Sequence, residues 1–496
     1  MAVLHLRRAM SQIGGNRLGT RDELTWMPAH RLRKEIADRK VSPVEAVENT
    51  LRRIEQHNPK LNAFLTVIAD QALDAARRAE QAVMKGQKLG PLHGVPVSIK
   101  DLEGVKGVRQ TNGCLFYKDN VSTSDALATE RLRAAGAIIV GKTNTSEFGH
   151  IGTNENRLGD ACRNPWNTSC TSGASSGGAG ASVAAGMTVI AQGSDGGGSI
   201  RIPSGFCGIY GIKPSQGRVP RRLANIDSWH PINFSNVGPM TRDVRDAAIM
   251  LQVLAGPAPD HEPGTIESAP PDFVAALEKG VKGKRIAWSA DIGGVPVDPE
   301  VVRVAEAAAR AFRDMGATVE AADFKLDDPQ VVFDNFQVIY RTRAYAVNGH
   351  LLRDHKELLT DYLMEGMEKG RAVTGEELFD ALSYLNKYRA YIRDFFTKWD
   401  LLLTPTLAVP AFPINQHPEK IGGRPVAHRL WGFTPFTYPF NMGMNPAASA
   451  PAGFSSGGLP IGLHIIGKFG DEESVFAASA AFEKARPWAQ HRPKGF

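Results

Sequence analysis

The sequence predicts an α/β fold, with helices on both sides of a central mixed β-sheet. Short apolar runs that fit buried strands alternate with amphipathic helical segments as far as the C-terminus. The clearest example is a strand at 284–290, a helix at 299–315 and a second strand at 317–321, in direct succession. The length of 496 residues alone would allow about two to four domains.

The composition is ordinary for a globular protein, with 42% hydrophobic and 22% charged residues. The 58 basic and 52 acidic side chains are mixed along the chain, whereas nucleic-acid-binding proteins gather basic charge in patches. No apolar run approaches about 18 residues, the length that would indicate a membrane helix. We therefore expect neither a nucleic-acid partner nor a membrane segment.

Residues 1–20 contain three arginines and no acid, and they lack the apolar region of a secretory signal. We expect a flexible tail there. The four cysteines have no metal-ligand spacing, which predicts free thiols, no metal site and a reducing, cytoplasmic location. These cysteines are Cys114, Cys162, Cys170 and Cys207.

Helices are predicted over residues 21–58 and 69–86. The first contains Ser42-Pro43-Val44-Glu45, which supplies an N-cap, a proline at the first helical position and an early acid. An alternating apolar strand follows at 95–99 and ends at Lys100. Because neighbours on a strand point to opposite faces, Asp101 should point away from the side of Lys100.

Residues 125–141 are predicted to form a helix and then a buried strand. The stretch from Gly136 to Thr143 formally matches the P-loop pattern G-x-x-x-x-G-K-[ST]. In a P-loop the strand precedes the first glycine, and the variable positions form a loop around phosphate. Here those positions are an apolar strand, so we reject a nucleotide-binding P-loop.

The later elements alternate in the same way. Irregular connections are expected at 221–240 and 431–445, both with aromatic residues, and a surface linker at 255–272. The other predicted elements are helices within 329–398, a strand at 399–405, a strand within 458–467 and a last helix at 471–485.

Between these elements, residues 173–203 are unusually rich in glycine and carry three serines that could act as nucleophiles. A glycine inside regular structure costs about 0.5–1 kcal/mol relative to alanine, so such a density needs a reason. Backbone that must turn sharply or approach a ligand closely provides one. The stretch therefore predicts an active site built from backbone N–H groups and from Ser175, Ser176 and Ser199.

A serine nucleophile needs a base and donors for the developing oxyanion. No histidine lies in a triad motif, and G-x-S-x-G and HExxH patterns are absent. Lys100 is the remaining base, and it permits a relay in which Ser199 passes a proton to Ser175 and Ser175 passes it to Lys100. The pKa of Lys100 would have to fall by roughly 3 units, or about 4 kcal/mol, to act near pH 7.

The glycines directly before Ser199 suit an oxyanion hole. Consecutive small residues let successive N–H groups converge on one oxygen. A flexible linker is the alternative for such a string, but the following Ile200-Arg201-Ile202-Pro203 favours an ordered turn.

The run Gly173-x-Ser175-Ser176-Gly177-Gly178, followed by Asp195-x-Gly197-x-Ser199-Ile200-Arg201-x-Pro203, resembles the amidase signature family. The resemblance covers about residues 40–485, including the segments around Lys100, Lys142 and Asn164. It implies one α/β domain over residues 21–496 with a large mixed sheet. Within it we expect N-terminal helices (21–86), a catalytic core (90–250) and a remainder (284–496) with further strands and substrate-side helices.

The resemblance also implies the roles of the site residues. Ser199 would be the nucleophile, Ser175 a bridging serine with a cis peptide bond, and Lys100 the base. The oxyanion hole would use N–H groups of Gly196, Gly197, Gly198 and Ser199, supported by Ser176, Asp195 and Arg201. The chemistry needs no metal and no organic cofactor.

The expected activity is hydrolysis of small-molecule amides, with carbamates (urethanes), anilides and esters as further candidate substrates. The alternative is the glutamine-hydrolysing component of a tRNA-dependent amidotransferase. The segment from Arg221 to Pro231, and His464 where glutamine is common, favour a stand-alone enzyme, as a monomer or homodimer. A catalytically dead scaffold is disfavoured because Lys100 and both serines are present. Residues predicted to contact substrate are Trp229, Phe234, Cys170 and Thr171.

Overall fold

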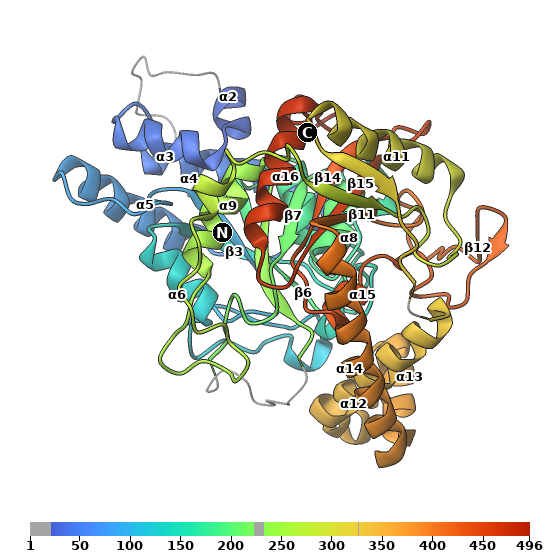
Figure 1. The fold of residues 1–496 in the computed structure, drawn as a ribbon. Coiled ribbons are helices and arrows are strands. Elements are labelled where there is room, and N and C mark those ends of the chain that lie inside the picture. Colours follow the sequence, from blue (N-terminus) through green and yellow to red (C-terminus); the bar gives the residue numbers. More distant parts are fainter. Residues whose placement is uncertain (1–20, 223–232, 326) are drawn as a thin grey trace.

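The computed structural model describes residues 21–222, 233–325 and 327–496 (Figure 1). The tail predicted at residues 1–20 and the predicted substrate contact Trp229 lie outside these ranges. None of the described helices is both long enough and apolar enough to cross a membrane.

The described strands form a mixed sheet of 11 strands in the order β1-β3-β2-β6-β8-β7-β14-β15-β11-β9-β10. Its strands are β1 (Phe64–Val67), β2 (Pro96–Lys100), β3 (Ile138–Thr143), β6 (Ile190–Asp195), β7 (Tyr210–Lys213), β8 (Asn236–Thr241), β9 (Arg285–Trp288), β10 (Thr318–Ala321), β11 (Leu401–Pro405), β14 (Ala447–Phe454) and β15 (Pro460–Gly467). Strands β2, β3 and β6 are parallel, whereas β8 runs antiparallel to β6. Two small sheets pair β4 (Arg163–Asn164) with β5 (Asn167–Thr171) and β12 (Lys420–Ile421) with β13 (Arg424–Pro425).

Helices cover both faces of the large sheet, and α12, α13 and α14 extend away from it at one end of the molecule (Figure 1). The described α-helices are α2 (Arg21–Trp26), α3 (Ala29–Ala37), α4 (Pro43–Leu61), α5 (Ala69–Met84), α6 (Leu127–Ala134), α7 (Gly177–Ala184), α8 (Arg201–Cys207), α9 (Val244–Leu254), α10 (Phe273–Ala276), α11 (Pro299–Asp314), α12 (Pro329–Asp354), α13 (Asp361–Ala372), α14 (Gly375–Lys398), α15 (Pro439–Met442) and α16 (Glu472–Ala485).

Strand β11 shows how the two layers are built. Leu401 and Leu403 belong to a core cluster with Phe312 of α11 and α16 side chains, whereas Leu402 belongs to a second cluster with Phe396 of α14. Successive side chains of a strand point to opposite faces, so one apolar run serves both cores. The predicted α/β class, with helices on both sides of a mixed sheet in one large domain, is confirmed.

Several local predictions are confirmed. Ser42 and Glu45 form the capping box of α4, with Ser42 Oγ accepting from the Val44 N–H at 2.9 Å. The rejection of a P-loop is correct, because β3 occupies its variable positions and Lys142 is buried in an ion pair with Asp101 at 3.0 Å.

The prediction that residues 221–240 are irregular is wrong at its C-terminal end. Strand β8 begins at Asn236 and lies between β6 and β7 in the sheet. Its sequence contains Gly238 and Pro239, which do not suggest a strand. A Cβ on Gly238 would lie 2.2 Å from the Ile212 carbonyl oxygen, so the strands can approach this closely only with glycine there.

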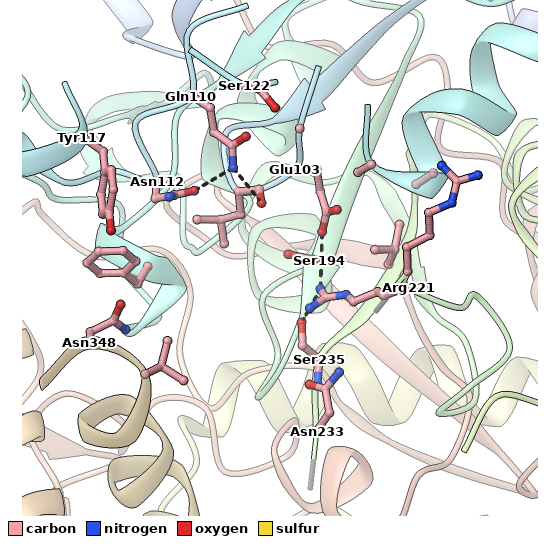
Figure 2. A pocket seen from close by; sticks show the side chains of 18 of the residues that line it. Glu103, Gln110, Asn112, Tyr117, Ser122, Ser194, Arg221, Asn233, Ser235 and Asn348 are labelled. Carbon is pink, nitrogen blue, oxygen red and sulfur yellow. Dashed lines mark hydrogen bonds and ion pairs between the residues drawn. The ribbon is translucent and has the colours of Figure 1, made fainter. Parts of the chain in front are cut away.

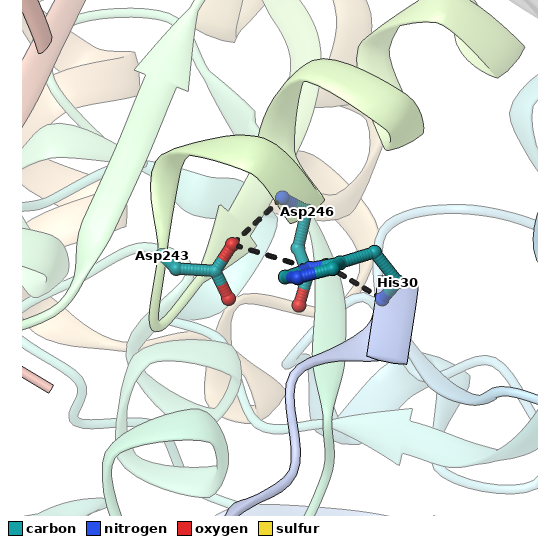
Figure 3. Close-up of side chains that lie close together, drawn as sticks. All are labelled: His30, Asp243 and Asp246. Carbon is teal, nitrogen blue, oxygen red and sulfur yellow. Dashed lines mark hydrogen bonds and ion pairs between the residues drawn. The ribbon is translucent and has the colours of Figure 1, made fainter. Parts of the chain in front are cut away.

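A hydrogen-bonded cluster joins α3 to the start of α9 (Figure 3). The Asp246 carboxylate accepts from the backbone N–H groups of Ala29 at 2.5 Å and His30 at 2.8 Å, and Asp243 accepts from the Asp246 N–H. Possible ligand atoms of His30, Asp243 and Asp246 lie within 4.8 Å of one another. Because Asp246 is already engaged by these N–H groups, the cluster serves as a cap for α3.

Candidate active site

The parallel pairing of β2 and β6 brings the predicted catalytic segments together. Lys100 is the last residue of β2, and β6 ends at Asp195, directly before the glycine turn that carries Ser199. The carboxyl ends of parallel neighbours meet at one edge of a sheet. Ser175 lies just before α7, which packs against β6, so one sheet edge gathers all three residues.

Lys100 and Ser175 are in direct contact. Lys100 Nζ donates to Ser175 Oγ at 2.6 Å and to the Ser194 carbonyl oxygen at 3.1 Å. The lysine side chain is 0% exposed. Burial lowers the pKa of Lys100 to about 7, against the opposing influence of the Asp195 and Glu103 carboxylates. This meets the requirement set by the sequence, because a neutral amine is then available near pH 7.

Ser176 connects the two serine segments. The peptide bond between Ala174 and Ser175 is cis. The next N–H, that of Ser176, donates to the Ser199 carbonyl oxygen at 3.0 Å. Ser176 Oγ also donates to the Ser194 carbonyl oxygen at 3.1 Å and accepts from the Ser194 N–H at 3.2 Å. These bonds fix Ser175 relative to the end of β6.

The Asp195 carboxylate holds the turn that carries Ser199. It accepts from the N–H groups of Gly198 at 2.7 Å and Ile200 at 3.1 Å, on either side of Ser199. The Arg201 guanidinium binds both of its oxygens, at 2.9 and 3.0 Å. Burial would raise the pKa of Asp195, but Arg201 reverses this and keeps the carboxyl ionised. Asp195 and Arg201 therefore support the turn from below.

The turn also explains which N–H groups remain for a ligand. The Gly198 N–H is occupied by Asp195, as described above. Among the described residues, those of Gly196, Gly197 and Ser199 donate to no partner. Gly198 itself has φ +133°, and a Cβ there would lie 2.4 Å from Thr437 Oγ1, so only glycine fits.

Thr437 and Asn441, from the segment before and within α15, contact this turn directly, and sequence reasoning missed both. Thr437 Oγ1 donates to the Gly197 carbonyl oxygen at 2.7 Å, and Asn441 Nδ2 donates to the Asp195 carbonyl oxygen at 3.1 Å. No motif marks either residue. Only the aromatic character of residues 431–445 drew attention to this segment.

A cavity of about 860 Å³ adjoins the site (Figure 2). Ser194 lines it, as does Ser235, whose Cβ lies 3.7 Å from the place that a Cβ on Gly196 would take. Arg221 also lines it, held by Glu103 at 3.3 Å and Ser235 Oγ at 3.0 Å (Figure 2). The charged residues around the cavity are Glu103, Arg221, Arg222, Glu262 and Arg343.

Aromatic side chains form the other boundary of the glycine turn. Atoms of Trp431 and Phe336 would lie 3.1 and 3.3 Å from a Cβ on Gly197. Tyr340 stacks on Phe336 with ring centroids 5.2 Å apart, and Tyr340 also lines the cavity. An apolar surface thus meets a polar cavity beside the turn.

The predicted substrate contacts lie elsewhere. Phe234 is buried and stacks on Phe336, with centroids 5.7 Å apart. Cys170 and Thr171 lie in β5, where the Thr171 N–H donates to the Phe412 carbonyl oxygen at 2.9 Å. None of the three lines the cavity, and their contact with substrate stays a prediction. All four cysteines are free thiols, as predicted.

Comparisons with known proteins agree with this geometry. A family model described as Amidase matches residues 45–476. A protein of Rhodococcus erythropolis named acylamidase is 37% identical over 478 residues, which cover 96% of this chain and 98% of that protein. The glutamyl-tRNA(Gln) amidotransferase of Geobacter sp. (strain M21) has a component, its A chain, that is 35% identical over 492 residues, or 94% of this chain and 98% of that one.

Solved structures give the same picture. A bacterial aryl acylamidase of the amidase signature family superimposes with a TM-score of 0.88 and 33% identity, over 94% of this chain and 97% of that one. A 6-aminohexanoate cyclic dimer hydrolase, solved with its substrate, superimposes with a TM-score of 0.80 and 28% identity, over 95% and 99% of the two chains.

Proposed function

Because the chain belongs to the amidase family and is thus a hydrolase of carbon–nitrogen bonds other than peptide bonds, we propose that it is a stand-alone amidase with a Ser199-Ser175-Lys100 triad. The observation that carries the proposal is the 2.6 Å contact between the fully buried Lys100 Nζ and Ser175 Oγ. A buried lysine with no carboxylate partner in direct contact, beside a hydroxyl, is arranged as a base.

The first step is attack of Ser199 Oγ on the carbonyl carbon of the amide. The hydroxyl proton of Ser199 passes to Ser175 Oγ while the proton of Ser175 passes to Lys100 Nζ. Ser175 is 2% exposed and Lys100 0%, so bulk water does not compete for these protons. Ser199, at 8% exposed, is the most accessible of the three.

The negative charge on the carbonyl oxygen is stabilised by N–H groups of the glycine turn. We assign this role to Gly196, Gly197 and Ser199, and leave Gly198 out because its N–H is bonded to Asp195. One such donor is worth about 10²–10³ in rate when the site is preorganised.

Collapse of the tetrahedral intermediate breaks the C–N bond. Lys100 returns its proton through Ser175 to the leaving nitrogen, which departs as an amine and leaves an ester on Ser199. Water then attacks this ester by the same relay in reverse, giving a carboxylic acid and free Ser199.

The surroundings of the turn support an apolar or aryl group on the substrate, because Phe336, Trp431 and Tyr340 border it. A cavity of about 860 Å³ is large enough for a small-molecule substrate. Carbamates, anilides and esters share the acyl carbon and leaving group of an amide, and they belong to the proposed substrate range.

The proposal is tested by a mass-spectrometric hydrolysis screen of the purified chain. The panel contains glutamine, aliphatic amides, anilides and aryl carbamates, with the ester of each acyl group for comparison. We expect turnover of at least one anilide or aliphatic amide without any partner protein. If only esters are cleaved, the assignment as an amidase is wrong.

The second candidate is the glutamine-hydrolysing component of a tRNA-dependent amidotransferase. It is favoured by the 35% identity to such a component over nearly the whole chain. Under this alternative, glutamine is the substrate of choice in the panel, and affinity purification from the native host brings the other amidotransferase components with the chain.

The pKa of Lys100 sets a pH dependence. Only the neutral amine accepts a proton, and its fraction falls tenfold for each pH unit below a pKa of about 7. We therefore expect kcat/KM for an amide to rise with a slope of one from pH 5 to about pH 7 and then to level off. Circular dichroism at each pH checks that the fold persists. A flat profile from pH 5 to 7 would exclude a lysine base with this pKa.

A further inference from the structure

The segment that precedes and includes α15 contacts the backbone of the glycine turn and not its side chains. Thr437 and Asn441 make these contacts, and both side chains are 0% exposed. Hydrogen bonds in such a dry environment are stronger than in water. Each bond ends on a carbonyl oxygen of the turn, so it fixes the orientation of a whole peptide plane.

Thr437 controls the peptide between Gly197 and Gly198. Its hydroxyl donates to the Gly197 carbonyl oxygen at 2.7 Å, and the N–H on the other side of the same peptide donates to Asp195 Oδ1 at 2.7 Å. In a trans peptide the C=O and N–H point in opposite directions. This peptide is therefore held at both ends and cannot rotate.

Asn441 controls the peptide between Asp195 and Gly196. Its Nδ2 donates to the Asp195 carbonyl oxygen at 3.1 Å, which turns the Gly196 N–H the opposite way, away from α15. The Ile202 N–H treats the peptide before Ser199 similarly, by donating to the Gly198 carbonyl oxygen at 2.7 Å. The free N–H groups of Gly196 and Ser199 are thus the reverse sides of anchored carbonyls.

Arg201 closes the network. Its Nη1 donates to the Thr437 carbonyl oxygen at 2.9 Å, and its Nη2 donates to Asn441 Oδ1 at 2.6 Å. The same guanidinium binds both oxygens of Asp195. Thr437 and Asn441 are therefore themselves held by the group that holds the turn.

We infer that Thr437 and Asn441 are positioning residues that direct the oxyanion-hole N–H groups, an inference that rests on the proposed amidase function. Neither side chain needs to touch the substrate. Their effect passes through the peptide planes that they anchor, so it appears when negative charge develops on the carbonyl oxygen and not when the substrate binds.

The test is a matched pair of variants. Thr437→Val removes the hydroxyl and keeps the shape, whereas Thr437→Ser keeps the hydroxyl. We expect T437V to lower kcat for an amide by about 10- to 100-fold with little change in KM, and T437S to recover activity to within about threefold of the wild type.

A transition-state analogue separates positioning from general damage. A trifluoromethyl ketone with the acyl group of the best substrate adds to Ser199 and forms a charged tetrahedral adduct. Its inhibition constant should rise in T437V by the factor by which kcat/KM falls. The corresponding alcohol, which forms no adduct, should bind equally well to both proteins.

Thr241→Val is the control. Thr241 is equally buried and also donates its hydroxyl to a carbonyl oxygen, that of Asp243, at 2.6 Å. It lies at the opposite end of β8 from Asn236, the partner of Asp195 in the sheet. T241V should keep the wild-type kcat.

The inference is overturned if T437V matches the wild type, if its loss lies in KM, or if the ketone and the alcohol weaken together. If T437V does not fold, Thr437→Ala removes the same donor without adding a buried methyl group, and the same outcomes apply. Failure of the wild type to cleave any amide would instead refute the proposed function.

Discussion

Replacement of Ser199 by alanine is expected to abolish amide hydrolysis, with kcat/KM at least about 10⁴-fold lower. Without Oγ no ester can form on the enzyme, and the intact Lys100–Ser175 pair has no nucleophile to activate. Ser199 Oγ makes no hydrogen bond to a described side chain, so its loss should leave the fold unchanged. Product formation by mass spectrometry measures the rate, and a fluorophosphonate probe measures labelling of the nucleophile.

Ser182→Ala is the matched control for Ser199→Ala. Ser182 lies in α7, close to Ser175 in sequence, and its hydroxyl donates to the Ala179 carbonyl oxygen at 2.9 Å. This variant should keep both turnover and labelling. Stoichiometric labelling of S199A at another residue would move the nucleophile away from Ser199.

Replacement of Lys100 by methionine is expected to lower kcat/KM for amides by about 10²–10⁴-fold. Ser175 then has no acceptor for its proton, and the leaving amine has no donor. Methionine fills the site of the lysine stem without a buried charge, so the protein should fold. The rise of activity between pH 5 and 7 should disappear along with the rate, and a pH series of amide hydrolysis measures both effects.

Lys213→Met tests whether the effect belongs to Lys100. Lys213 is also fully buried, and burial lowers its pKa to about 7 as well, but its Nζ donates to the Pro214 carbonyl oxygen at 2.8 Å. The pH dependence should therefore survive in Lys213→Met. Near-normal rates for K100M at pH 7 would rule out the lysine base.

The catalytic part of the site could be predicted because its signals are local. Ser175 and Ser199 lie in one glycine-rich stretch, and Lys100 ends an alternating strand. Burial of a strand end also accounts for the lowered pKa of Lys100, which the sequence argument required and the structure supplies. The requirement came from chemistry, whereas the means came from packing.

The support of the site could not be predicted in the same way. Thr437 and Asn441 lie more than 200 positions from the backbone atoms that they bind, and a carbonyl oxygen carries no sequence signal. The engagement of the Gly198 N–H depends on where the Asp195 carboxylate points. Strand β8 was missed for a related reason, since Gly238 is needed by a neighbouring strand and not by its own.

The position of β14 and β15 in the sheet has a consequence for synthesis of the protein. These strands come late in the chain, yet β14 pairs with β7 near the middle of the sheet. Until β14 leaves the ribosome, β7 is an open, apolar edge that can pair with another chain. At about 5–20 residues per second this exposure lasts tens of seconds. The nascent chain is therefore most prone to aggregate when its catalytic serines and lysine have already been made.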